Sequence, residues 1–207
     1  MSSPQRRSPL AHRQTLTGDQ ERSHIRELFF VGKLILRTEA GLGVGPVKLV
    51  TGLELPIVAG GVSADGARNI LWLGPDEWLI TCDDLDAAAL HAGLGGALKN
   101  VHHQIADVSD YYTTIRLAGA EARDMLSKLT TLDMHPKVFA VGRCAGSIFG
   151  KANAWLYLRR DDEENGPEFD LHVRWSMADY LWCALSEAGR EYGFAHQSPI
   201  GQVPVRA

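Results

Sequence analysis

The spacing of short strand-like segments in the first half of the chain limits the folds open to it. Phe29–Arg37 alternates apolar and charged side chains, as a half-buried strand does. Ile70–Leu73 and Glu77–Cys82 flank a Gly-Pro-Asp turn, a pattern typical of two adjacent strands. Val101–Val108 is predicted to be a further strand.

Two helices are expected between these strands. Pro46 suits a first helical position and Gly52 a C-terminal cap, so a short helix is predicted between them. The residues before it predict a flexible loop, with glycines at Gly41, Gly43 and Gly45. Asp83 or Asp84 can cap the second helix. Its predicted buried stripe consists of Leu85, Ala88, Ala89 and Ala92. The order strand, helix, strand, strand, helix, strand is the split βαβ, or ferredoxin-like, arrangement.

Residues 109–207 approximately repeat this order. A one-sided strand is expected around 113–117 and a helix from about Ala120. Further strands are predicted around Ser147, at Ala154–Arg159 and at Glu168–Arg174. The last strand alternates, with Phe169, Leu171 and Val173 on one face and Asp170, His172 and Arg174 on the other. A final helix follows, where Ser176 and Asp179 resemble a capping box.

The predicted fold class is therefore α+β, with two ferredoxin-like (split βαβ) halves and antiparallel sheets. Residues 1–25 are polar and without a sustained period, so we expect a flexible N-terminal tail. Residues 26–207 are expected to form a single compact domain whose halves are about 26–108 and 109–207.

Charge and composition narrow the classes of function. The net charge of −4 argues against a nucleic-acid-binding protein, which would concentrate lysine and arginine. No apolar run approaches the roughly 20 residues that span a bilayer, so no membrane association is expected. The three cysteines are far apart and have no Cys-x-x-Cys pairing. Buried free thiols in a reducing compartment follow, and the cytoplasm is the expected location.

No motif in the sequence predicts catalysis. Residues 41–45 read G-x-G-x-G rather than the dinucleotide-binding G-x-G-x-x-G, and Gly150-Lys151 lacks the Walker spacing. His102 and His103 are adjacent in a predicted strand and should point to opposite faces. Two nucleophile-like groups lack a base and an orienting partner, Cys144 with Ser147 and Asp107 with Ser109, and the second pair favours turn chemistry. No catalytic, cofactor-binding or metal-binding residue is predicted.

Two tryptophans are candidates for a partner interface. Trp155 lies on the strand face opposite Ala154 and Leu156, and Trp182 lies beside the apolar stripe of its helix. A large aromatic side chain outside the main apolar face either widens the core or marks an interface. Both alternatives are open for both residues.

Five blocks of sequence resemble one known family in matching order and spacing. They are GKLILR at 32–37, LWLGPDEWLI at 71–80, DVSDYYTTIRLAGAEARDMLSKL at 107–129, LDMHPKVFAVGRCA at 132–145 and FDLHVRWSMADYLWCAL at 169–185. Together they resemble the gamma subunit of bacterial heterotetrameric sarcosine oxidase over roughly residues 26–194. Departures from the family pattern occur around 146–155 and in the DDEENGP loop at 161–167.

The resemblance implies a fold akin to the folate-binding region of the glycine-cleavage T-protein. It also implies assembly with alpha, beta and delta subunits in a complex that oxidatively demethylates sarcosine to glycine. The one-carbon unit passes to tetrahydrofolate or leaves as formaldehyde. FAD, FMN, NAD and tetrahydrofolate are expected on the partner subunits, and this chain is expected to be a structural member without a cofactor of its own.

Two alternatives stay open. The chain could be the equivalent subunit of an N-methylglutamate dehydrogenase, with the same architectural role and a different substrate. It could also be a stand-alone T-protein-like protein that binds tetrahydrofolate itself. Iron–sulfur-assembly relatives of that kind carry a Lys-Gly-Cys-Tyr-x-Gly-Gln-Glu motif. The nearest text here, Gly142–Gly146, lacks its aromatic residue and its Gln-Glu pair.

Overall fold

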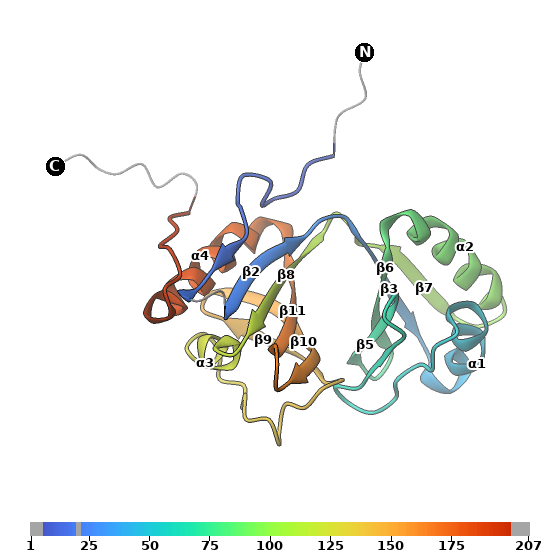
Figure 1. Ribbon diagram of the computed structural model, residues 1–207. Helices are drawn as coiled ribbons and strands as arrows, with labels where there is room; N and C mark the ends of the chain where they lie inside the picture. The colour runs from blue at the N-terminus through green and yellow to red at the C-terminus, as the bar shows by residue number, and fades with distance from the viewer. Residues whose placement is uncertain (1–5, 20–21, 200–207) are drawn as a thin grey trace, which may run out of the picture.

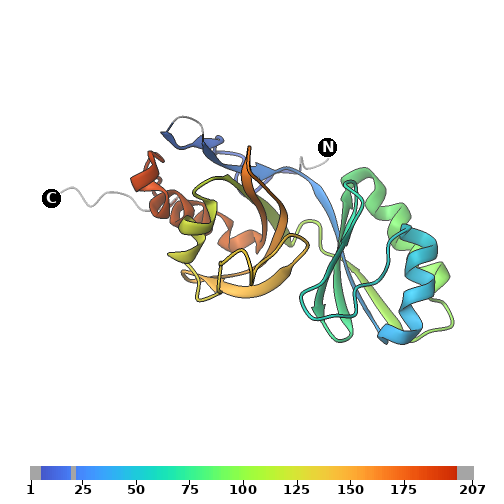
Figure 2. The ribbon, with the colours of Figure 1, turned by 60° about the horizontal axis from the view of Figure 1, so that its bottom comes forward.

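Two antiparallel sheets lie between two layers of helices (Figures 1 and 2). The computed structural model describes residues 6–19 and 22–199. Helices α1 and α2 cover the outer face of a five-stranded sheet, the smaller sheet, and α3 and α4 cover that of a six-stranded sheet, the larger sheet. The inner faces of the two sheets meet at a small apolar cluster, made by Leu71 and Leu79 from one and Cys144 and Tyr157 from the other. The α+β prediction is confirmed.

The smaller sheet has the strand order of a split βαβ unit. Its order is β4-β5-β6-β3-β7, and its strands are β3 (Val31–Thr38), β4 (Val62–Ala64), β5 (Asn69–Gly74), β6 (Glu77–Asp83) and β7 (His103–Asp107). Helix α1 (Ala40–Thr51) follows β3, and α2 (Ala87–Ala97) follows β6. The predicted alternation of strands and helices is therefore confirmed, with β4 added at one edge.

The larger sheet repeats this arrangement with one strand taken from the N-terminal segment. Its order is β1-β2-β8-β11-β10-β9, and its strands are β1 (Leu16–Thr17), β2 (Ser23–Leu28), β8 (Tyr112–Gly119), β9 (Cys144–Phe149), β10 (Ala152–Asp162) and β11 (Gly166–Arg174). The helices are α3 (Ala122–Ser127) and α4 (Ala178–Ala188). Strands β2-β8-β11-β10 match β7-β3-β6-β5 in position, so β2 fills the place of a missing fourth strand after α4.

The N-terminal segment is thus part of the larger sheet. Leu10 is fully buried in the core beneath this sheet, and β2 pairs with β8 along its whole length. Arg13 donates two hydrogen bonds to Asp179 at the start of α4, at 2.8 and 2.7 Å. The expected tail over residues 1–25 is wrong for the described residues 6–19 and 22–25, while residues 1–5, 20 and 21 lie outside the described part. The chain crosses from the larger sheet to the smaller sheet between β2 and β3, so the smaller-sheet half begins after residue 28 rather than at residue 26. It crosses back between β7 and β8.

A short 3₁₀ helix replaces the predicted capping box. Ser176 lies inside this turn, η3 (Trp175–Met177), so α4 begins after Met177 and no side chain caps it. The Asp179 carboxylate binds Arg13 of the N-terminal segment.

Helix α1 corrects the expected glycine loop. It begins at Ala40 and contains all three glycines as well as Pro46, and Gly52 ends it in a left-handed conformation with φ of 78°, as predicted. A Cβ atom on Gly43 would lie 2.7 Å from the Thr38 methyl group. This helix therefore has a glycine where it packs closely on the end of β3.

Helix α2 buries a different face from the one predicted. Asp83 accepts a hydrogen bond from the Leu85 backbone at 2.9 Å, which confirms the cap. A short 3₁₀ helix, η2 (Asp84–Asp86), follows this cap before α2 begins. This turn changes the helical phase, so Leu85 is 90% exposed and the buried stripe is Ala87, Leu90 and Leu94.

Strand β11 is buried on both faces. Phe169, Leu171 and Val173 lie in the core with α3 and α4, as predicted. The opposite face, which the alternation assigns to polar residues, is also covered, so Asp170 and His172 are buried.

No helix of the described residues is long and apolar enough to cross a membrane.

Candidate functional site

The two candidate tryptophans have different environments. Trp182 is 1% exposed and lies in the core between α4 and the larger sheet. The core alternative therefore holds for Trp182, and this residue offers no surface to a partner. Trp155 is half-buried on the inner face of the larger sheet, where it pairs with Gly146 of β9 and His172 of β11. A Cβ atom on Gly146 would lie 3.0 Å from the indole ring, so the glycine lets the ring lie flat on the strand.

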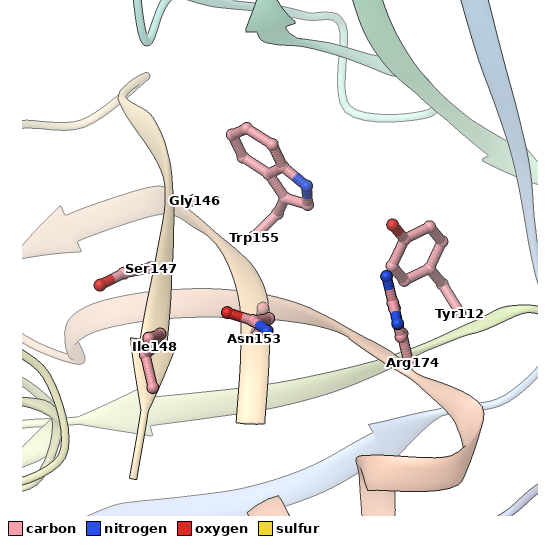
Figure 3. Close-up of a pocket in the computed structure, with 8 residues that line it drawn as sticks. Tyr112, Gly146, Ser147, Ile148, Asn153, Trp155 and Arg174 are labelled. Atoms are coloured by element: carbon pink, nitrogen blue, oxygen red, sulfur yellow. The ribbon is translucent and has the colours of Figure 1, made fainter. Parts of the chain in front are cut away.

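The indole of Trp155 forms one wall of an open hollow of about 430 Å³, the Trp155 groove (Figure 3). Its other principal walls are Tyr112, Ile148, Asn153 and Arg174. These residues come from β8, β9, β10 and the end of β11, so the sheet itself positions them. The groove lies beside the smaller sheet, and its lining residues all come from the larger sheet.

Away from this groove, a polar layer fills the space between the sheets. Arg116 on β8 donates from Nε and Nη2 to the two carboxylate oxygens of Asp170 at 2.7 and 2.9 Å. Glu168 lies 3.2 Å from the same guanidinium, and Arg159 approaches both carboxylates from β10. The two arginines and the two carboxylates in this layer therefore form ion pairs with one another.

His172 is buried in this layer beside a hollow of about 240 Å³ between the sheets. Its Nδ1 shares a hydrogen bond with the Thr114 hydroxyl at 3.0 Å. Burial lowers the pKa of His172 to about 4, so the imidazole is neutral at pH 7. The sequence placed His172 on a polar face but did not predict its burial.

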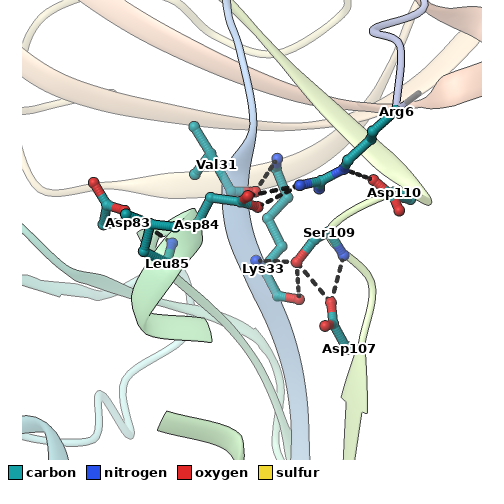
Figure 4. Close-up of polar contacts among 9 residues, drawn as sticks. All are labelled: Arg6, Val31, Lys33, Asp83, Asp84, Leu85, Asp107, Ser109 and Asp110. Carbon is teal, nitrogen blue, oxygen red and sulfur yellow. Dashed lines mark hydrogen bonds and ion pairs between the residues drawn. The ribbon is translucent and has the colours of Figure 1, made fainter. Parts of the chain in front are cut away.

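Lys33 is buried, like Arg116, and the N-terminal segment covers it (Figure 4). Its Nζ donates to the Val31 carbonyl at 3.0 Å. Arg6 bridges Asp84 and Asp110 above it, with bonds of 2.6 and 2.5 Å. Burial lowers the pKa of Lys33 to about 8.

The residues between β7 and β8 carry turn chemistry, as predicted. The backbone and hydroxyl of Ser109 both donate to Asp107, at 2.9 and 2.6 Å. The Ser109 hydroxyl also accepts from the Lys33 backbone N–H at 2.9 Å. This turn therefore fixes the second crossing between the halves.

The cysteine thiols are held in their neutral form. Burial raises the pKa of Cys82 to about 11 and that of Cys144 to about 12, and it also raises the pKa of Cys183. The Cys144 thiol donates to the Trp72 carbonyl at 3.2 Å, whereas Ser147 bonds to Thr130. The described residues include no group of three or more His, Cys, Asp or Glu side chains placed to hold a metal ion.

Known proteins resemble this chain both in sequence and in fold. Residues 42–191 match the model of the sarcosine oxidase, gamma subunit family. The chain is 34% identical over 170 residues to the sarcosine oxidase subunit gamma of Corynebacterium sp. strain U-96, covering 77% of this chain and 80% of the relative.

The chain belongs to the sarcosine oxidase gamma subunit family.

Solved structures agree with this membership. The heterotetrameric sarcosine oxidase of Corynebacterium sp. U-96 contains a chain that superposes with a TM-score of 0.80 at 30% identity, covering 93% of this chain and 99% of that one. The glycine cleavage aminomethyltransferase of Bartonella henselae shares the fold, with a TM-score of 0.56 at 13% identity over 78% of this chain and 44% of that one. The expected likeness to the T-protein fold is thereby confirmed.

For this gamma-family chain, the sequence identified Trp155 but missed the residues around it. Arg174 was predicted only as one of three polar residues on one face of its strand, and Tyr112 was not assigned to any element. Strand pairing brings these residues together: Arg174 pairs with Tyr112, and Trp155 with Gly146. The sequence alone does not determine which strands pair or in which register, so it carried no signal for the groove.

Proposed function

We propose that this chain is the gamma-type subunit of a heterotetrameric sarcosine oxidase and that its contribution is architectural. The observation that carries this proposal is the structural match to a chain of a heterotetrameric sarcosine oxidase, which covers 99% of that chain. The chemistry of the described residues supports it, because burial keeps the Cys144 thiol neutral and the buried Asp170 pairs with Arg116.

On this proposal the reaction takes place on partner subunits. Alpha, beta and delta chains would carry FAD, FMN, NAD and tetrahydrofolate, and this chain would carry none of them. The complex would oxidise sarcosine to glycine and pass the one-carbon unit to tetrahydrofolate or release formaldehyde. Assembly would occur in the cytoplasm, without nucleic acid or membrane.

Native purification of the tagged chain from its natural host tests the proposal. We expect larger subunits, identified by mass, to co-purify with it, and flavin absorbance to appear in the complex and not in the isolated chain. Rates with sarcosine and with N-methylglutamate then identify the substrate. Recovery of the chain without larger subunits would contradict the proposal.

The aminomethyltransferase likeness favours one second candidate, a chain that binds tetrahydrofolate itself. A curated aminomethyltransferase from Saccharopolyspora erythraea is 31% identical over 121 residues, covering 58% of this chain and 32% of the relative. The hollow between the sheets, lined by His172, Thr114 and Asn69, is the place such a ligand would occupy. Calorimetric titration of the purified chain with tetrahydrofolate decides this, since saturable binding without partners would support the second candidate.

A further inference from the structure

We propose that the Trp155 groove and the aromatic rim beside it receive an extended, acidic segment of a partner subunit. This inference rests on the proposed function and adds to it a place on the chain and a chemistry for the partner.

A second tyrosine ring lies next to the groove. Tyr112 meets Tyr111 edge to face, with ring centroids 4.8 Å apart. Tyr111 is exposed and lies beside Arg174, so the two tyrosine rings form the aromatic rim of the groove. Tyrosine, tryptophan and arginine are the side chains that most often dominate binding energy at protein interfaces. The composition therefore fits a docking surface better than a solvated sheet face.

The charge of this surface selects an acidic partner. Arg174 is exposed, and no carboxylate within residues 6–19 and 22–199 pairs with it. Its guanidinium carbon lies 5.5 Å from the Tyr111 ring centroid, which orients the group at the mouth of the groove. The remaining groove walls are neutral. A guanidinium held in this way binds a carboxylate through two parallel hydrogen bonds.

The shape of the surface favours an extended segment. The groove is open rather than enclosed, and its 430 Å³ has room for only a few side chains. It lies against β9, which has a neighbouring strand on one side only. Extended segments commonly bind along such an edge and insert alternate side chains into adjacent pockets. One apolar side chain would lie between Trp155 and Tyr112 while a carboxylate meets Arg174.

A second copy of this chain fits less well. A symmetric dimer brings the same patch of both copies together, so two Arg174 side chains would approach each other. Like charges across an interface oppose association. The cationic surface is therefore better matched by a different chain.

The test uses the whole chain, tagged and purified with its partners from its natural host. Arg174→Glu and Trp155→Ala are expected to lower the recovery of larger subunits by about tenfold or more. Arg26→Glu is the matched control, because Arg26 is also an exposed arginine on the larger sheet without a described ion pair. Circular dichroism and the Tm of each isolated chain verify folding. If Trp155→Ala lowers the Tm, a loss of partners with that variant could come from unfolding. The Arg174→Glu variant alone then tests the inference.

Each outcome has a definite meaning. Loss of the partners with both groove variants, and not with Arg26→Glu, supports the inference. Equal recovery with all variants overturns it and leaves the proposed function intact. Wild-type chain without partners contradicts the proposed function itself. A dimer of the isolated chain that Arg174→Glu dissociates shows that a second copy occupies the surface, and this also overturns the inference.

Discussion

Arg116 donates two hydrogen bonds from its guanidinium to the carboxylate of Asp170, at 2.7 and 2.9 Å, in the layer between the two sheets. Both side chains are buried. The energetic cost of breaking such a pair exceeds its net contribution to stability, because the remaining charge stays buried.

Arg116→Ala should therefore lower the free energy of unfolding by about 3 kcal/mol. Arg26 lies opposite Arg116 on the neighbouring strand but is exposed, so Arg26→Ala should change stability by about 0.5 kcal/mol or less. Urea denaturation followed by fluorescence measures both. Equal small losses would mean that the ion pair is more hydrated than the structure shows.

Stability should fall between pH 6.5 and pH 4 because of His172. Its folded pKa of about 4 lies below its ordinary value of 6.5, so only the unfolded chain takes up a proton in this interval. The stabilisation is complete above pH 6.5 and is lost as the pH approaches 4, by about 3 kcal/mol. His172→Gln should remove this part of the pH dependence, whereas exposed His91→Gln should not. Parallel curves for wild type and His172→Gln would rule the explanation out.

Replacing Lys33 with methionine should stabilise the chain. Among the described residues the buried ammonium has a single hydrogen-bond acceptor, the Val31 carbonyl, and burial lowers its folded pKa to about 8, so the charged form is disfavoured. Lys33→Met should raise the free energy of unfolding at pH 7 by about 2 kcal/mol. The gain should shrink as the pH rises from 8 to 10.5, where the unfolded lysine also loses its proton. Exposed Lys99→Met serves as the control, and a lower Tm for Lys33→Met would refute the prediction.

Gly119 is expected to be irreplaceable. Its φ is 121°, and a Cβ atom there would lie 2.1 Å from the Arg22 carbonyl oxygen, at the junction of β8 and β2. Gly119→Ala should destabilise the chain by about 4 kcal/mol. Gly142 also has a positive φ, of 80°, but open space around it, so Gly142→Ala should cost only about 1 kcal/mol. Thermal unfolding of both variants separates the steric cost from the backbone strain.

The sequence predicted most elements of the smaller sheet because local patterns determine them. The Gly-Pro-Asp turn, the Asp83 cap and the Gly52 cap all act within a few residues. Errors arose where packing changed a local preference. Glycines 41, 43 and 45 lie in helix α1, where Gly43 packs closely on the end of β3. The 3₁₀ turn before α2 changed its buried face from Leu85 to Leu90.

Long-range pairing accounts for the rest. Nothing local indicates that β2 joins β8, or that a second sheet covers Asp170 and His172. Period-2 alternation correctly separated the two faces of β11, but it could not show that the polar face is also buried. The Trp155 groove depends on four strands that meet only in the folded chain.

The N-terminal origin of β2 makes the order of synthesis important. The smaller sheet can close as soon as β7 has left the ribosome, because all of its strands precede that point. Strand β2 emerges before the smaller sheet, yet its main partner β8 emerges only after β7, so β2 must wait with only the two-residue β1 beside it while the smaller sheet folds. Cutting the gene between the sequence halves would leave β2 on the wrong fragment. A circular permutant with the β2–β3 connection broken and β2 placed after α4 would carry each sheet on one continuous stretch of sequence. Such a chain could then be split between β7 and β8.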